Sequence, residues 1–574
     1  MKQLMGFVLF GVMTLINPTE GDASTTQCGV NGCVITVDWA IDEESDSSTH
    51  TCDYTQGGLF FPDSTGSGAG KCTLRRAIRE AGARSDDSIC PGCSPVVIRF
   101  TGLDGTNADA DDSQYDATND QWVLPIDSGS SAADHFRLRG QGALDVVGNI
   151  SINGLGYNNA AIPMPRVFIE TSSSLQVELS DVSVDGLGFI GGMGVVFKEP
   201  GGSFTNNTWG ISPDGTAVYF QDIVNNADAM AGPIGVSNNL DGDGLLVADN
   251  IFAGASTKAI EINSGTTGVI IRDNFIGTRG DGTVPTVPDN LKCRGFANPF
   301  NPTLDPAEWF GGWGISAAGT GLLIEDNVIV GLQNIRSTND TPPMALEVFG
   351  ASHTLTNNVI GIDNAFSFEG VCGQGIKFST SSDPLDPMSF GHQVISNVIV
   401  ASRNGFENTK GAILWSDTSL PPNLDGGNTV RGNLVLNGPE KYFEMGPMIS
   451  SAARSFEPGE ITSIMGTTVT GVSDQSNALG SPSPCPNCII DFYLDDMDAN
   501  EEALDYLGST VALSDGTFSF DLDEPLDAGF GIRTTSTSQA NNVIPNTWAG
   551  TTSEMSSVVY LPGASDLIFA NGFD

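Results

Sequence analysis

Basic residues are scarce in this chain of 574 residues. Lys and Arg total 24 against 69 Asp and Glu, which gives a formal net charge of -45. Proteins that bind nucleic acid use Lys and Arg to neutralise phosphates, so the composition excludes that class of partner. The same charge disfavours anionic membranes. It would also repel an acidic polysaccharide unless calcium or a local basic cluster lay between the two.

Long hydrophobic runs are also missing. The apolar stretch at residues 4–16 follows a single Lys and is too short to cross a bilayer. Small residues, Gly21 and Ala23, stand shortly after it. This pattern predicts a secretory signal peptide over residues 1–23, and hence an exported mature chain without a transmembrane segment.

Long amphipathic helical patterns are nearly absent, and charged residues make up only 16% of the chain. The 70 glycines and the short runs of strand formers between Asn, Asp, Ser and Thr indicate many short strands joined by turns. The chain is too long for one ordinary compact core, so this composition favours an elongated repeat array with additions.

A repeated pattern organises the middle of the chain. Segments such as LLVADNIFAG and VIIRDNFIGT place an Asn amid aliphatic residues, with apolar residues three positions before it and two positions after it. The aligned residues are Asn250, Asn274, Asn327, Asn358, Asn397 and Asn433. The shortest interval, residues 250–274, fits one turn of a parallel β-helix. We expect these Asn residues to take the left-handed conformation at a bend and to form an internal ladder, and residues 274–327 to hold an extra turn or a large loop.

Three acidic residues, Asp249, Asp273 and Asp326, each precede a ladder Asn. Stacked carboxylates supply the hard oxygen ligands that calcium prefers, so these residues are candidate metal ligands. The alternative is a turn role without metal, because the uncharged Asn357 and Gly432 hold the same position in other repeats. No other cofactor is expected.

A second set of strand signals lies between the Asn repeats, as in AIEIN, ALEVF and GIKFS. Alternation places Glu261, Glu347 and Lys377 on one outward face, where they are candidate catalytic residues of a polysaccharide lyase or glycoside hydrolase. Two acids two turns apart would be separated by about 9 to 10 Å, at the upper end of the range for inverting glycosidases. Ordinary solvated surface residues are the alternative.

Aromatic residues gather in the stretch EWFGGWG, within the longest insertion. Trp309, Phe310 and Trp313 on a loop would offer flat faces for stacking on sugar rings, or would pack the insertion against the solenoid wall. His353 and His392 each stand five residues before their repeat Asn, so they are expected to stack on adjacent turns, as packing residues or as a metal or proton site.

Ten cysteines in an exported chain are expected to pair. Sequence order suggests five disulfides: Cys28 with Cys33, Cys52 with Cys72, Cys90 with Cys93, Cys293 with Cys372, and Cys485 with Cys488. The two C-x-x-C pairs, CPGC and CPNC, could instead supply four thiolates to zinc, although they lie in separate regions.

One short helix is predicted over residues 71–83, KCTLRRAIREAGA, with Leu74, Ala77, Ile78 and Ala81 on its apolar face. We expect it to cover the open end of the solenoid. The segment CTLRRAIREA closely resembles the CSLREA motif that opens a family of exported bacterial right-handed β-helix proteins, with Thr for Ser and Arg for Glu. The phrases PVVIRF, GNISINGLGY and PRVFIE are similar to that family as well. The resemblance implies a pectin-lyase-like fold.

The chain changes character after residue 455. Short alternating segments such as CIIDFYLDD and GTFSFDL predict a small antiparallel sandwich. It resembles the Ig-like or transthyretin-like module at the end of such β-helix proteins. The final DLIFANGFD is similar to IFxxGFE-like endings of exported proteins in some Gram-negative bacteria, as a sorting signal or as a frayed strand.

Together these patterns predict an all-β chain: a right-handed parallel β-helix with an N-terminal cap helix and a C-terminal β-sandwich. The expected divisions are a signal peptide (1–23), a cap region (24–94), the β-helix (95–455), an Ig-like sandwich (456–562) and a tail (563–574). The leading functional hypothesis is binding or adhesion at a cell surface or matrix, with glycans as the expected ligands. The expected location is secreted or on the cell surface of a Gram-negative bacterium. The alternatives are a polysaccharide lyase or hydrolase, and a structural spacer.

Overall fold

The fold comes from a computed structural model of the chain. The structure describes residues 26–29, 32–37, 72, 74–85, 93–100, 115–116, 121–125, 136–138, 149–154, 156–170, 175–190, 194–216, 234–236, 243–253, 258–284, 310–311, 313–333, 344–368, 370–371, 373–379, 390–400, 411–416, 427–436, 441–446, 456–475, 483–496, 498, 500–539 and 550–560. The expected signal peptide (1–23) and tail (563–574) lie outside these residues.

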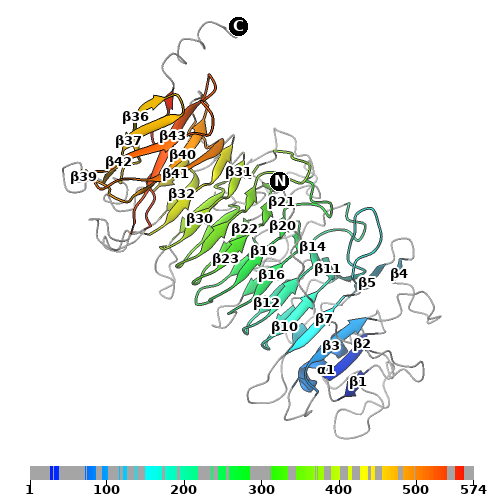
Figure 1. Cartoon of the computed structure of the whole chain (residues 1–574). Coiled ribbons are helices and arrows are strands. Elements are labelled where there is room, and N and C mark those ends of the chain that lie inside the picture. The colour runs from blue at the N-terminus through cyan, green and yellow to red at the C-terminus, as the bar shows by residue number, and fades with distance from the viewer. Residues whose placement is uncertain are drawn as a thin grey trace, which may run out of the picture.

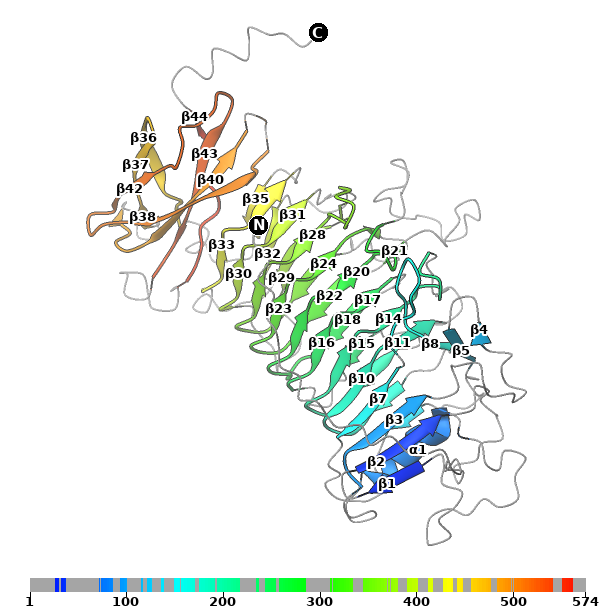
Figure 2. The ribbon, with the colours of Figure 1, turned by 45° about the vertical axis from the view of Figure 1, so that its right-hand side comes forward.

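Three long sheets, here named A, B and C, stack along one axis and form a right-handed parallel β-helix (Figures 1 and 2). Sheet A contains β1 (Thr26–Gly29), β2 (Gly32–Val37), β3 (Val96–Phe100), β7 (Ile150–Asn153), β10 (Val182–Asp185), β13 (Ser203–Thr205), β16 (Leu246–Ala248), β19 (Ile270–Arg272), β23 (Leu323–Glu325), β27 (Thr354–Thr356), β30 (Gln393–Ile395) and β33 (Thr429–Arg431). Sheet B contains β4 (Tyr115–Asp116), β5 (Gln121–Pro125), β8 (Val167–Glu170), β11 (Leu187–Ile190), β14 (Thr208–Trp209), β17 (Ile251–Phe252), β20 (Phe275–Ile276), β24 (Val328–Ile329), β28 (Val359–Ile360), β31 (Val398–Val400) and β34 (Leu434–Leu436). Sheet C contains β6 (Phe136–Leu138), β9 (Leu175–Val177), β12 (Val195–Phe197), β15 (Ile234–Val236), β18 (Lys258–Ile262), β22 (Trp313–Ala317), β26 (Leu346–Val348), β29 (Ile376–Ser379), β32 (Gly411–Ser416) and β35 (Lys441–Met445).

Aliphatic columns fill the interior, because residues at one repeat position pair directly with their equivalents one turn away. In sheet A, for example, Val247 pairs with Ile271, and Ile271 pairs with Ile324. All three are fully buried. Stacking at the interstrand spacing of about 4.8 Å puts each side chain in contact with the turns above and below, so the core continues through the stack. The predicted fold class is confirmed.

The asparagine ladder is confirmed, and it stands at the corner between sheets A and B. In each step one Asn amide donates to the side-chain oxygen of the next Asn, at 2.9 Å from Asn274 to Asn327 and again from Asn327 to Asn358. That same oxygen also accepts the preceding ladder residue's backbone N–H, at 3.2 Å for Asn274. The ladder begins one turn earlier than the alignment indicated, at Asn207, which contacts Asn250.

The expectation that the ladder Asn is the left-handed residue is wrong, since that role belongs to the residue before it. Asp249, Asp273 and Asp326 have φ values of 58°, 55° and 55°, and Asn357 has 55°. Asp, Asn and Gly are the residues that tolerate this conformation best, which explains why the position carries a charge in some turns and none in others.

The chain between Asn274 and Asn327 makes one turn of the solenoid, through β20, β22 and β23, and contains no extra turn, because these two residues are direct neighbours in the ladder. In the same interval, β21 (Phe310–Gly311) pairs with β25 (Leu332–Gln333). At the other end of the molecule, β2 already pairs in parallel with β3. Sheet A therefore starts within the expected cap region, earlier than residue 95.

Helix α1 (Leu74–Arg84) lies between β2 and β3 in the chain and packs against both of these strands and against β6 (Figure 1). Its predicted apolar residues, Leu74, Ala77, Ile78 and Ala81, are all buried in the core that runs through the solenoid. Among the described residues, no helix has the length and apolar character needed to cross a membrane.

The C-terminal region forms a β-sandwich of two main antiparallel sheets. One sheet contains β36 (Glu460–Met465), β37 (Thr468–Val472) and β42 (Thr517–Asp521), and the other contains β40 (Ile489–Asp495), β41 (Asp505–Val511), β43 (Gly531–Thr537) and β44 (Val559–Tyr560). A small hairpin joins β38 (Asp474–Gln475) to β39 (Ser483–Pro484). Side chains from both main sheets, including Val469, Phe492 and Phe518, fill the space between them.

This sandwich closes the C-terminal end of the solenoid. The last ladder amide, on Asn433, donates to the hydroxyl of Tyr442, which lies 3.4 Å from the hydroxyl of Tyr493 in the sandwich. Arg431 on β33 makes two 2.7 Å bonds to Asp491, which is fully buried on β40. The final turn therefore finds in the sandwich the partners that another turn would supply.

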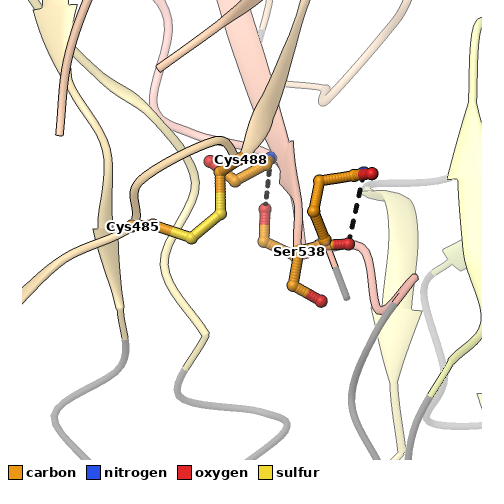
Figure 3. The surroundings of a disulfide bond; sticks show 6 residues. Cys485, Cys488 and Ser538 are labelled. Atoms are coloured by element: carbon orange, nitrogen blue, oxygen red, sulfur yellow. Dashed lines mark hydrogen bonds between the residues drawn. A yellow bond between two sulfur atoms is a disulfide. The ribbon is translucent and has the colours of Figure 1, made fainter. Parts of the chain in front are cut away.

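One predicted disulfide, Cys485–Cys488, is confirmed, with its Cα atoms 5.5 Å apart (Figure 3). It lies just before β40. Cys33, Cys72 and Cys93 are also disulfide-bonded, so no described cysteine is left for zinc. Cys28 and Cys33 face each other across β1 and β2, which is compatible with their predicted pairing. The side chains of Cys28, Cys52, Cys90, Cys293 and Cys372 lie outside the described part of the chain.

Replacing Asn327 with Leu should lower the free energy of unfolding by about 2–5 kcal/mol, because it removes the acceptor of the Asn274 backbone N–H and two side-chain hydrogen bonds of the buried ladder. Urea unfolding followed by circular dichroism measures the change. Asp326→Asn is the matched control, since Asn accepts the same φ, and it should change stability by less than about 0.5 kcal/mol. Equal effects of the two variants would show that the ladder does not stabilise the stack.

Arg431→Ala should destabilise the protein by about 3–5 kcal/mol, because it leaves the buried Asp491 carboxylate unpaired. Arg272→Ala removes an exposed partner of Asp273 and should cost at most about 1 kcal/mol. Thermal unfolding of the two variants side by side tests whether the contact between solenoid and sandwich contributes to stability.

Candidate functional site

The outward-facing candidates stand in one row across sheet C, as predicted. Glu261 pairs with Ser316, Ser316 with Glu347, and Glu347 with Lys377. The structure thus brings Glu347 next to Lys377 and places Glu261 two strands away from Glu347. Burial differs along the row, because Glu347 is only 4% exposed. The middle of the row is therefore covered, and the expected open groove does not run along its whole length.

The covered part of the row holds a compact polar cluster. The Lys377 ammonium lies 3.6 Å from Oε1 of Glu347, and the Ser379 hydroxyl donates to the same oxygen at 2.9 Å. The second carboxylate oxygen, Oε2, is buried without a hydrogen-bond partner. Because Glu347 is paired with a cation and shielded from solvent, it is poorly placed to take a proton from a bound substrate.

The more accessible end of the row carries Lys258, Glu261 and Trp313, here named the Trp313 patch. Lys258 pairs in register with Trp313, and its ammonium lies 5.2 Å from the centre of the indole ring. The same ammonium lies 2.6 Å from Oε1 of Glu261. Lys258 and Glu261 each keep about a quarter of their side-chain surface exposed, at 24% and 25%.

Trp313 was expected on a loop, but it is the first residue of β22 and so belongs to the rigid wall of the solenoid. Its ring is half-buried, and Lys258 holds it through the attraction between a cation and an aromatic face. Trp309 and the side chain of Phe310 lie outside the described residues. The segment GISAA, which starts at Gly314, is one of the strand signals predicted from the sequence, and the structure begins that strand one residue earlier, at Trp313.

The three stacked acids behave as turn residues. Asp273 is paired with Arg272 at 3.3 Å, and burial together with the neighbouring Asp273 charge raises the pKa of Asp249. Their carboxylates do not meet as a group of three within metal-ligand distance, and calcium at these positions stays an untested prediction. In the described part of the chain, such a group is formed by Asp495, Asp496 and Asp498. The acidic run DDMDANEE marks this group in the sequence, although its residues were not among the predicted metal ligands.

His353 and His392 form a second ladder rather than a metal site. Their rings stack with centroids 4.8 Å apart, and both residues are fully buried. Nδ1 of His353 accepts the backbone N–H of Leu322, and Nδ1 of His392 accepts that of His353, each at 3.2 Å. An imidazole nitrogen that accepts a hydrogen bond must be unprotonated, so this arrangement requires both rings to be neutral.

No protein-family model matches this chain, and no curated protein matches it in sequence. The resemblance to the CSLREA family therefore rests on the residues of α1 and the first turns alone.

Burial lowers the pKa of His353 to about 4, whereas an exposed His titrates near 6.5. Protons therefore bind the unfolded chain first as the pH falls. The contribution of neutral His353 to the free energy of unfolding should therefore be fully present above about pH 6.5. It should fall by about 3 kcal/mol in all as the pH drops to about 4.

The comparison of wild type with His353→Asn isolates this contribution, because Asn can accept the same backbone N–H without titrating. Asn428 already does so for His392, at 3.0 Å. Urea unfolding at pH 7, 6 and 5 should show a steeper loss of stability in the wild type. If the free energy of unfolding changed equally with pH in the two proteins, the result would contradict the conclusion that the buried His353 ring is neutral.

Proposed function

We propose that the chain is an exported binding protein that recognises glycans through the Trp313 patch on sheet C. The observation that carries the proposal is a half-buried indole fixed by Lys258, which is itself paired with Glu261. Sugar rings present apolar C–H faces and hydroxyl edges, so an aromatic face beside charged hydrogen-bonding groups suits them. The rigid strand keeps these groups in place before binding, which lowers the entropy cost of association.

The local charge indicates which glycans fit. Lys258 and Glu261 compensate each other, as Lys377 and Glu347 do further along the row. The patch thus offers no excess positive charge, while the chain as a whole carries a net charge of -45. Neutral polysaccharides are therefore the preferred ligands, and acidic ones would be repelled.

The setting of this activity follows from the sequence patterns. Three sequence patterns support secretion or surface display by a Gram-negative bacterium: the expected signal peptide, the CSLREA-like segment and the C-terminal IFANGFD phrase. Binding or adhesion to surrounding glycans is a function that such a location favours. A purely structural spacer would have no need of a fixed, accessible Trp313.

A polysaccharide lyase or hydrolase is the second candidate, favoured by the positions of Glu261 and Glu347 two strands apart in one row. Two strand spacings would separate the two carboxyl groups by about 9 to 10 Å, a distance at which an inverting glycosidase can still operate. The lysine pairing of both carboxylates weighs against it, because each acid is engaged before substrate arrives.

A glycan array probed with the full-length protein tests the binding proposal. Trp313→Ala should weaken binding to the recognised glycan by about tenfold or more, since the stacking surface is lost. Glu261→Gln, which preserves shape and removes one charge, should reduce affinity less. Phe366→Ala is the control, because Phe366 is an aromatic residue that is 80% exposed and lies between β28 and β29, outside the strands of sheet C. Absence of binding to any glycan would support the spacer instead.

Incubation with a polysaccharide panel, followed by assay of reducing and unsaturated ends, separates binding from catalysis. We expect no product. Product formation that Glu347→Gln abolishes would establish the enzyme and overturn the proposal of binding alone.

A further inference from the structure

The acidic group at the end of β40 is the one described place where three potential metal ligands converge. One carboxylate oxygen from each of Asp495, Asp496 and Asp498 lies within 4.8 Å of the other two. Asp495 is fully buried, Asp496 is half-buried and Asp498 is exposed. The group therefore runs from the sandwich interior to its surface, so that an ion could enter from solvent.

Asp495 provides a separate indication of a missing partner. Its Oδ2 accepts a hydrogen bond from Nε of Arg533, but its Oδ1 is buried without any hydrogen-bond partner. A buried carboxylate oxygen without a partner is strongly unfavourable, and native structures rarely keep one without an ion or a water beside it. The other two nitrogens of Arg533 donate to the carbonyl oxygens of Ser556 and Asn500, so each nitrogen of this guanidinium already has an acceptor.

The charge of the group matches a divalent cation. Three carboxylates carry three negative charges, and Arg533 compensates one of them, which leaves about two. Close carboxylates repel each other unless a cation lies between them. The chain also places Glu501 and Glu502 directly after these residues, which increases the negative potential at this edge of the sandwich.

The loop also presents its oxygens in the order that calcium loops use. Asp496, Asp498 and Asn500 stand at alternate positions, and each of the first two accepts the backbone N–H two residues later, at 2.9 and 2.7 Å. The Asn500 amide also donates to Asp498 at 2.7 Å. These bonds hold Asp496, Asp498 and Asn500 close to one another, and each carboxylate keeps further lone pairs that could bind an ion. Oxygen ligands alone, in an irregular arrangement, suit calcium better than transition metals.

We propose that Asp495, Asp496 and Asp498 bind one calcium ion at the solvent-facing edge of the sandwich, with Asn500 beside them. The ion contacts the unpartnered oxygen of Asp495 and bridges the other two carboxylates, and water fills its remaining coordination positions. This site is independent of the glycan-binding proposal, because it lies on β40 of the sandwich rather than on sheet C.

Isothermal titration of the full-length protein with calcium tests the site, after treatment with a chelator and in about 0.15 M salt to screen diffuse counterion binding. The test variant is Asp496→Asn with Asp498→Asn. Asn keeps the shape of both side chains, and neither residue is fully buried, so the fold should survive. The matched control is Asp523→Asn with Glu524→Gln, which removes the same charge from exposed positions in the same sandwich.

Wild type and control should bind one more calcium ion per chain than the test variant, or bind it at least about tenfold more tightly. Calcium should also raise the melting temperature of the wild type and the control, but not that of the test variant. Equal loss of binding in both double variants would show that bulk charge alone attracts calcium, and would overturn the proposal. Magnesium binding as tight as that of calcium would overturn the assignment of the ion.

Terbium, which replaces calcium and luminesces when a nearby tyrosine absorbs light, gives a second readout. The Tyr560 hydroxyl donates to the carbonyl oxygen of Asp496 at 3.4 Å, so it is close enough to sensitise an ion in the site. Tyr560→Phe should weaken the luminescence while leaving calcium binding intact. Luminescence that is unchanged in the Asp496→Asn, Asp498→Asn variant would place the ion elsewhere and contradict the site.

Discussion

The hydrogen bonds of the asparagine ladder are the interaction on which the stack depends. At the corner between sheets A and B the backbone bends, and the regular pairing between strands is interrupted. The side-chain oxygen of each ladder Asn accepts the N–H of the neighbouring turn, as Asn358 does for Asn327, so this buried backbone donor keeps a partner at the bend. Because the amide is the same length in every turn, it also keeps successive turns in register and allows the aliphatic columns to align.

Charge and function are arranged around this interior. The buried columns and ladders are closely packed, whereas the outer face of sheet C carries polar groups. Glu261 alternates along β18 with the buried Ile260 and Ile262, so its side chain points away from the core. The calcium site that we propose at the Asp495 edge adds a second binding region, on the sandwich.

Much of the fold could be predicted from the sequence because it follows from repetition. The column of Val247, Ile271 and Ile324 is visible in the alignment, and stacking converts each aligned position into a contact. The conformation of Asp273 was harder to predict, since either member of an Asp-Asn pair tolerates a positive φ and only the bend decides which one adopts it. The burial of Glu347 was not predictable either, because alternation reports the direction of a side chain and not what covers it. Trp313 shows a limit on boundaries, because the strand signal GISAA begins one residue later and only the structure adds Trp313 to that strand.

The two ends of the solenoid have a consequence for its behaviour in solution. An uncovered turn of a parallel β-helix presents unpaired backbone groups and an open apolar core, which together form a template on which another chain could add. Here the amide of the last ladder residue, Asn433, donates to Tyr442, and the backbone N–H of Val430 on the edge strand β33 donates to the hydroxyl of Thr552 in the sandwich region. At the other end, α1 packs its apolar face against the core of the first turns. Covers of this kind disfavour the addition of another chain to a stack that has the geometry of a fibre.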